Sequence, residues 1–227
     1  MEVEPVERRD FDMDGLLLDS ERLFQDAWRA LAEERGIVLG DTFTAEISGS
    51  GQEQQKEILR KYYPGADPDA LIAACKSRVY AMEETDLVLK KGAVELLETL
   101  RSSGFRCAVA SSSPLEMVRK NLARTDILKY FGVTVSGEEV SRGKPFPDVF
   151  LLAAEKLGLP AEKCYVFEDS MNGIRAAAAA RCVPVMVPDL VQPAEEIRAM
   201  CWVYPDLAAA CRALLSEPQQ AQKEPED

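Results

Sequence analysis

The feature that most restricts the fold is an alternation of short apolar runs with longer amphipathic stretches, which begins near Gly92. The apolar runs lie at 105–110, 131–135, 164–167 and 183–187, and helix-like stretches separate them. Buried strands that alternate with helices are typical of a parallel sheet with helices on both faces. We therefore expect an α/β core built on a doubly wound parallel sheet.

The segment before this alternation has a different pattern, because residues 17–86 contain almost no strand-like apolar runs. Apolar positions three and four apart over 19–36 predict an amphipathic helix, and two further helical stretches follow it. We expect residues 1–16 and 87–216 to form the core and residues 17–86 to form a small helical unit. The polar, proline-containing end of the chain, 217–227, is predicted to be disordered.

Charge and composition exclude several classes of function. A net charge of −12 argues against nucleic acid or an anionic membrane as the main partner. The chain has no histidine, which excludes Ser-His-Asp and Cys-His catalysis and His-ligated zinc or iron. Acid–base chemistry therefore falls to carboxylates, lysine or tyrosine. An anionic substrate has to be attracted locally, by a metal ion, a lysine or helix N-termini.

The cysteines and the start of the chain bear on its compartment. The six cysteines are scattered and form no C-x-x-C pair, which is typical of reduced thiols in a cytoplasmic protein. The first residues lack the basic segment and apolar stretch of a secretory signal. No apolar run approaches the roughly 20 residues of a membrane span. We expect a cytoplasmic protein.

The strongest chemical signal is Asp12-Met13-Asp14-Gly15. One carboxylate can attack phosphorus to form an aspartyl-phosphate, and a second can protonate the leaving oxygen and later deprotonate water. Gly15 allows a sharp turn where a side chain would obstruct the substrate. An EF-hand calcium loop is excluded, because the leucines at 16–18 supply no oxygen ligands.

Further polar residues stand where predicted strands end or a helix is about to begin. They are Ser111, Lys144, Glu168 and Asp169. Because ligands of open parallel sheets bind at the carboxyl ends of the strands, we expect these residues to gather near Asp12 and Asp14. Carboxylates, a hydroxyl beside a helix N-terminus and a lysine together suit a site for Mg²⁺ and phosphate.

Each of these residues also has a simpler interpretation. Lys144 could be a solvated surface lysine, and its surroundings do not form a Walker loop. The serines at 111–113 could cap a helix, with Ser113 as the N-cap and Pro114 at the first helical position. Glu168 and Asp169 could cap the next helix. The simpler view requires all of these interpretations to hold at once.

Together these motifs resemble, in order and over residues 10–205, those of the haloacid dehalogenase-like phosphohydrolases, and most of all the sugar-phosphatase and β-phosphoglucomutase branch. The resemblance implies a Rossmann-like core with an inserted helical cap. Asp12 would be the nucleophile and a Mg²⁺ ligand, and Asp14 the general acid/base that also offers its backbone carbonyl to the metal. Asp169, with Glu168, would complete the magnesium ligands.

The resemblance also implies how the substrate is held. Ser111, Ser112 and nearby backbone N–H groups would bind the transferring phosphoryl group, and Lys144 would balance its charge. The helical unit would be a mobile cap that closes over a small phosphomonoester. Three substrate-facing groups are expected from this cap: Glu21, Ser50 and Gln52. We expect no nucleic acid or membrane partner, and a monomer or weak dimer.

Two sequence features bear on the type of reaction. An aspartate at position 14 favours a phosphatase or phosphomutase over a dehalogenase, since halide needs no proton. The cap loop at 46–54 has no lysine or arginine to hold a second phosphate. The preferred interpretation is a phosphatase for a sugar or polyol phosphate. The alternatives are a β-phosphoglucomutase-like mutase and a catalytically impaired scaffold that binds a metabolite or a protein.

The sequence departs from the family's pattern in the first strand and at two later positions. The first strand carries Arg8, Arg9 and Asp10 where a central strand is normally apolar. Lys91 stands where proline is usual, and Arg181 where glycine is usual. If position 181 needs a left-handed backbone, arginine costs about 1 kcal/mol relative to glycine there. We therefore expect a protein less stable than its relatives.

Overall fold

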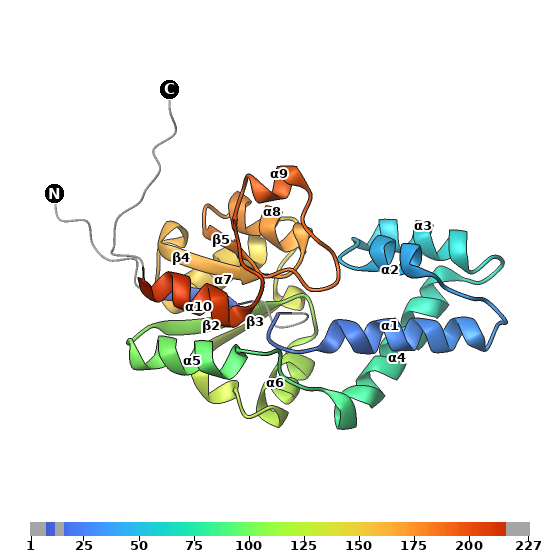
Figure 1. Cartoon of the computed structure of the whole chain (residues 1–227), viewed down its shortest axis with the longest axis horizontal. Coiled ribbons are helices and arrows are strands. Elements are labelled where there is room, and N and C mark those ends of the chain that lie inside the picture. Colours follow the sequence, from blue (N-terminus) through green and yellow to red (C-terminus); the bar gives the residue numbers. More distant parts are fainter. Residues whose placement is uncertain (1–7, 12–15, 217–227) are drawn as a thin grey trace.

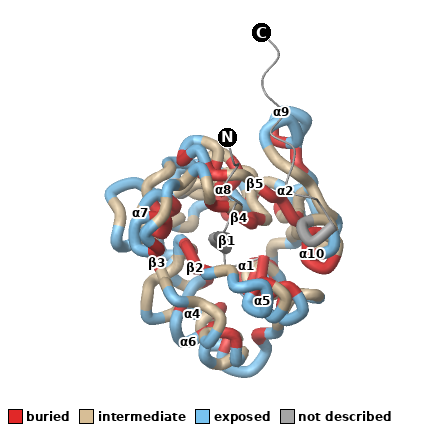
Figure 2. The backbone as a smooth tube through the Cα atoms, turned by 90° about the vertical axis from the view of Figure 1, so that its left-hand side faces the viewer, coloured by how far each residue is buried: buried red, intermediate tan, exposed pale blue. Residues whose placement is uncertain are grey.

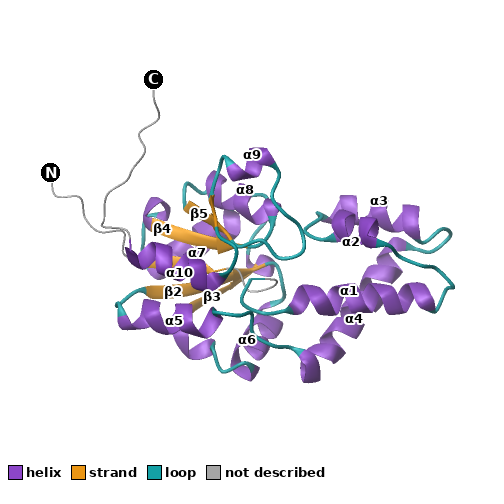
Figure 3. Cartoon of the chain, viewed as in Figure 1, coloured by secondary structure: helices purple, strands orange, loops and turns teal. Residues whose placement is uncertain are grey.

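The computed structural model describes residues 8–11 and 16–216. In this part of the chain, six parallel strands form one sheet in the order β3-β2-β1-β4-β5-β6. Figure 3 shows strands of this sheet with helices packed around them. The strands are β1 (Arg8–Phe11), β2 (Arg106–Ser111), β3 (Phe131–Ser136), β4 (Cys164–Glu168), β5 (Val183–Met186) and β6 (Trp202–Val203). The predicted doubly wound α/β core is confirmed.

Helices cover both faces of the sheet. They are α5 (Ala93–Ser102), α6 (Leu115–Arg124), α7 (Asp148–Leu157), α8 (Met171–Ala179), α9 (Glu195–Arg198) and α10 (Leu207–Ser216), with short 3-10 turns at Leu128–Tyr130, Gly137–Glu139 and Ala161–Lys163. Both faces need cover because successive side chains of a strand point to opposite faces. In β2, Cys107 and Val109 belong to one buried cluster with residues of α5, α6 and α10, whereas Ala108 and Ala110 belong to another with residues of α7 and α8. Figure 2 shows the buried segments toward the sheet and the exposed segments on the outer turns.

Four helices form a lobe at one end of the molecule (Figure 1). They are α1 (Ser20–Glu33), α2 (Asp41–Ile47), α3 (Gln52–Tyr62) and α4 (Pro68–Asp86). The lobe has an aromatic centre, where the rings of Trp28 and Phe43 meet edge to face at 6.2 Å and the Tyr63 hydroxyl donates to the Trp28 carbonyl at 2.8 Å. The predicted helical character of this segment is confirmed.

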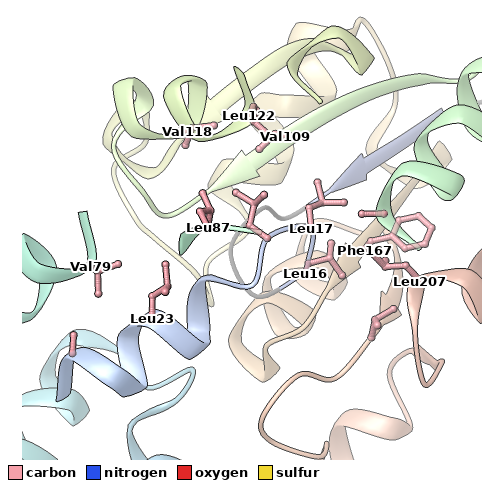
Figure 4. Packing of buried hydrophobic residues seen from close by; sticks show 14 of the residues in the cluster. Leu16, Leu17, Leu23, Val79, Leu87, Val109, Val118, Leu122, Phe167 and Leu207 are labelled. Carbon is pink, nitrogen blue, oxygen red and sulfur yellow. The ribbon is translucent and has the colours of Figure 1, made fainter. Parts of the chain in front are cut away.

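Two extended segments join lobe and core side by side. The Asp19 N–H donates to the Val88 carbonyl and the Lys90 N–H to the Leu17 carbonyl, both at 2.9 Å. The leucines at 16–18 are buried and belong to a cluster that runs from the core into the lobe (Figure 4). The apolar run after the Asp-x-Asp motif therefore anchors the crossover between the two parts.

Charged groups also meet at this crossover. Lys90 Nζ lies 3.0 Å from Asp19 Oδ1 and 2.6 Å from Asp189 Oδ1. Burial disfavours the charged form of Asp19, but hydrogen bonds from Lys90 and Arg22 outweigh it and hold the pKa of the Asp19 carboxyl below its usual range. The three groups tie both connecting segments to the loop that follows β5.

The charged first strand occupies the centre of the sheet. All four residues of β1 pair with β2 on one side and with β4 on the other, in unbroken register. The side chains of Arg8, Arg9 and Asp10 lie outside the described part of the structure, as do Asp12, Asp14 and the predicted disordered tail. The backbone of β1 is thus a regular central strand despite its composition.

The predicted N-cap of α6 is wrong. The helix begins at Leu115, and Pro114 rather than Ser113 is its N-cap residue. The Ser113 N–H donates to Ser111 Oγ at 3.0 Å, and the Leu115 N–H donates to the Glu138 carboxylate at 3.3 Å. A carboxylate from a neighbouring loop therefore caps the first turn, which no local pattern could indicate.

The cysteines behave as core residues. Five of them are buried, and Cys201 is partly exposed. Burial raises the pKa of the Cys75 thiol to about 12, so this group stays protonated and unreactive. Among the described residues, no helix combines the length and apolar character needed to cross a membrane.

Arg181 adopts the left-handed backbone that its position suggested, with φ of +61°. We expect Arg181→Gly to raise the melting temperature by about 2–4 °C, because relieving the strain is worth about 1 kcal/mol. Gly158 is the matched control, with φ of +72° and open space where a Cβ would stand. Gly158→Ala should shift the melting temperature in the opposite direction in the same thermal scan. An unchanged or lower value for Arg181→Gly would contradict the strain argument.

Candidate active site

A cavity of about 340 Å³ lies between the lobe and the carboxyl ends of the strands. This volume suits a small organic ligand. From the core, Lys144 and Asp169 line it, as predicted from their places in the chain, and so does Ser112, which the family resemblance implied. From the lobe, the predicted cap residues Glu21 and Ser50 line it as well. The structure thus brings five of the sequence-predicted site residues to one cavity.

The charged centre of the core side is a buried ion pair. Lys144 Nζ lies 2.6 Å from Glu168 Oε1, and the two side chains are 9% and 0% exposed. Lys144 Nζ also donates to the Ala110 carbonyl at 3.2 Å and lies over the Phe150 ring. The interpretation of Lys144 as a solvated surface lysine is therefore wrong. The lysine is held at the end of β2, where an anionic substrate would meet it.

The second oxygen of Glu168 is also occupied. Its Oε2 accepts hydrogen bonds from the Ser170 N–H at 3.1 Å and the Ser170 hydroxyl at 2.9 Å. Ser170 Oγ in turn accepts from the Gly173 N–H at 3.0 Å and is the N-cap of α8. The N-cap residue of α8 is therefore Ser170 rather than Glu168 or Asp169, and Glu168 supports the start of the helix by accepting from Ser170.

Glycine at position 173 makes this arrangement possible. A Cβ built on Gly173 would lie 1.8 Å from Glu168 Cδ and 2.0 and 2.1 Å from its two oxygens. Real Cβ atoms do not approach other atoms so closely, so only glycine leaves room for the carboxylate here. The Glu168 side chain therefore packs directly on the first turn of α8, where the helix dipole favours a negative charge.

The serine cluster occupies the end of β2. Ser111 is fully buried, and its Oγ fixes the Ser113 N–H. The Ser136 hydroxyl, from the end of β3, donates to the Ser113 carbonyl at 2.7 Å. These bonds hold the turn into α6 so that Ser112 lines the cavity just before the helix starts. Phosphate binding at a helix N-terminus needs this kind of fixed turn.

The cap loop is held from both sides. Within the lobe, the buried Gln25 donates to Ser48 Oγ at 3.1 Å and accepts from the Thr44 hydroxyl at 2.9 Å. From the core, Asn172 Nδ2 donates to the Gly49 carbonyl at 2.8 Å. Ser50 closes the turn by donating to the Ile47 carbonyl. The side chain of Gln52 lies outside the described part of the structure.

A family model described as haloacid dehalogenase-like hydrolase matches residues 11–181. This range covers most of the chain. The chain belongs to the haloacid dehalogenase-like hydrolases. The resemblance stated from the motifs is therefore confirmed.

Individual relatives of this hydrolase are similar over most of their length. A phosphorylated carbohydrates phosphatase from Thermotoga maritima is 36% identical over 75% of this chain and 79% of its own. Hexitol phosphatase B from Escherichia coli is 32% identical over 78% and 82%. Among solved structures, a hydrolase of the family from Deinococcus radiodurans with bound phosphate and sodium is 26% identical, covers 94% of this chain and 96% of its own, and has a TM-score of 0.75.

Several lining residues of this hydrolase were missed by the sequence argument. Lys76, Tyr80 and Glu83 share one face of α4, at helical spacing, and all three line the cavity. Asn121 of α6 and Asp189 after β5 do so too. The spacing on α4 is visible in the sequence, but which helix face meets the core depends on how the lobe packs. Lys76 also means that α4 brings a cation to the cavity even though the cap loop has none.

The donor set of the site fits magnesium. Its acids are carboxylates, and Mg²⁺ prefers oxygen ligands. Among the described residues no group of three acidic or cysteine side chains stands ready to hold a metal, and the other predicted ligands, Asp12 and Asp14, lie outside that part. Because Lys144 and Ser170 engage both oxygens of Glu168, Asp169 is the better placed of the two predicted acidic ligands that the structure describes.

Proposed function

We propose that this hydrolase is a Mg²⁺-dependent phosphatase that removes phosphate from a small sugar or polyol phosphate through an aspartyl-phosphate on Asp12. The observation that carries the proposal is the buried Lys144–Glu168 pair beside Ser112 and Asp169 at the cavity. Burying a lysine costs free energy, and a positive charge at the cavity wall would offset that cost by binding an anionic substrate. Relatives described as carbohydrate and hexitol phosphatases support the substrate class.

The reaction would proceed in two halves. In the first, a carboxylate oxygen of Asp12 forms a bond to phosphorus while the bond from phosphorus to the sugar oxygen breaks, and Asp14 gives that oxygen a proton. In the second, Asp14 takes a proton from water, whose oxygen attacks phosphorus and breaks the bond to Asp12. Lys144 and the N–H groups around Ser112 would balance the phosphoryl charge in both halves. Bound Mg²⁺ would supply further charge balance and orient the phosphoryl group.

The lobe at 17–86 would act as a cap that closes over the bound substrate. Two sets of contacts support this role. Asn172 holds the cap loop at Gly49, and on the other side Arg124 Nη2 lies 2.6 Å from Glu84 Oε2. A closed cap excludes water from the first half of the reaction, when water would compete with Asp12 as the nucleophile.

A phosphomutase is the second candidate, and Lys76 is the observation in its favour. A mutase needs a cation in the cap to hold the second phosphate of a bisphosphorylated intermediate, and Lys76 lines the cavity from α4. The carboxylates of Glu21 and Glu83 line the same cap side and would repel that phosphate. This balance favours the phosphatase.

Phosphate release from a panel of hexitol, hexose and short polyol phosphates tests the proposal. We expect release in the presence of Mg²⁺ and none after EDTA treatment, with activity restored by added Mg²⁺. Interconversion of hexose 1- and 6-phosphates without net release would instead identify a mutase. A folded protein that releases no phosphate from any substrate would support the binding-scaffold alternative.

A further inference from the structure

Two buried hydrogen-bond acceptors line the cavity without a partner among the described residues. Asn121 is 1% exposed, and its Oδ1 makes no hydrogen bond there. Asp189 has one oxygen on Lys90, while its Oδ2 is buried and also without a partner. Buried polar atoms in folded proteins are nearly always paired. Two unpaired acceptors at one cavity indicate that a bound ligand donates hydrogen bonds to them.

The position of Asn121 assigns it to the leaving group rather than to the phosphoryl group. The phosphoryl group is proposed to bind at the start of α6, next to Ser112. Asn121 lies six residues beyond Leu115, which places it about 9 Å further along the helix axis. A phosphate held at the helix start therefore leaves Asn121 for the organic part of the substrate.

The chemistry of the wall around Asn121 favours a neutral, hydroxyl-bearing group. A carboxamide oxygen and a carboxylate oxygen accept hydrogen bonds, and the hydroxyl groups of a polyol donate them. If the amide is turned the other way, its NH₂ meets a hydroxyl oxygen equally well. Glu21 and Glu83 add negative charge to the cavity, which disfavours a second phosphate or a carboxylate on the substrate.

We infer that Asn121 binds a hydroxyl of the leaving group and makes this hydrolase selective for phosphorylated polyols over phosphate esters that lack hydroxyls. The inference rests on the proposed phosphatase function and identifies a residue that sets its specificity. It requires that Asn121 contribute to binding of the polyol and not to the chemical step.

The test compares two substrates in wild type and Asn121→Leu, a replacement of similar size without polar atoms. For a hexitol 6-phosphate, kcat/KM should fall at least tenfold, mainly through KM. For p-nitrophenyl phosphate, which has no hydroxyl, kcat/KM should stay within about twofold. The melting temperature should not fall, because the change removes a buried acceptor that has no partner in the described part of the protein.

Each outcome bears on a different statement. If wild type releases phosphate from neither substrate, the proposed function fails and this inference fails with it. If wild type is active and Asn121→Leu changes both substrates equally, or neither, the phosphatase stands and the role of Asn121 is overturned. A lower melting temperature with an equal loss on both substrates would show a structural role. Asn121→Ala, well suited to a helix, gives the same comparison should the leucine variant fail to fold.

Discussion

Lys144→Met is expected to reduce phosphate release by at least about 100-fold and to lower the free energy of unfolding by about 3–5 kcal/mol. The activity is lost because, among the described residues, Lys144 is the one cation that lines the cavity from the core, where the phosphoryl charge has to be balanced. The stability is lost because Glu168, which is 0% exposed, would keep a buried charge without its partner. Steady-state kinetics and chemical denaturation measure the two effects separately.

Two controls separate the roles of the pair. The double variant Lys144→Met/Glu168→Leu should recover much of the stability, since apolar groups often replace a buried ion pair at little cost, but none of the activity. Lys156→Met removes a lysine that pairs with Glu139 at the surface and should change stability by no more than about 1 kcal/mol. Native stability in Lys144→Met would show that the buried pair does not hold the site together.

Gly173→Ala is expected to lower the free energy of unfolding by at least about 3 kcal/mol and to reduce phosphate release by at least about 100-fold. Helix propensity alone predicts the opposite, a gain of about 1 kcal/mol for alanine within α8. The new Cβ would stand 1.8 Å from Glu168 Cδ, so the carboxylate has to leave its place beside Lys144. Thermal scans and phosphate release on the same preparation measure both effects.

Gly132→Ala is the matched control for Gly173→Ala. Gly132 lies in β3, has no left-handed backbone and has no atom within 4 Å of the place of a Cβ. Its replacement should change stability by no more than about 0.5 kcal/mol and leave turnover intact. A rise in melting temperature for Gly173→Ala would mean that Glu168 has room to move without loss.

The core could be predicted from the sequence because its strands are buried on both faces and therefore form continuous apolar runs. Strands β2, β4 and β5 follow this rule. Strand β1 does not, since Arg8, Arg9 and Asp10 give no apolar signal, and only the Asp-x-Asp motif after it indicated its place. The left-handed backbone at Arg181 was predictable because it follows from where the preceding helix ends, and a helix end can be located from the nearby sequence.

The candidate site was predictable where a residue's place follows from the end of a strand. Ser112 directly follows β2 and Asp169 directly follows β4, and both line the cavity for that reason. The pairing of Lys144 with Glu168 was not predicted, because it joins groups 24 residues apart through tertiary packing. Asn121 was missed for a similar reason, since only the packing of the lobe on α6 turns this part of the helix into a cavity wall.

The most direct measurement is phosphate release by Asp12→Asn beside wild type, with Mg²⁺ and the best substrate of the panel. Asparagine keeps the shape of aspartate but is a far weaker nucleophile, so the expected result is a folded protein whose turnover is at least about 1000-fold lower. A folded Asp12→Asn protein that releases phosphate at the wild-type rate would contradict the aspartyl-phosphate route.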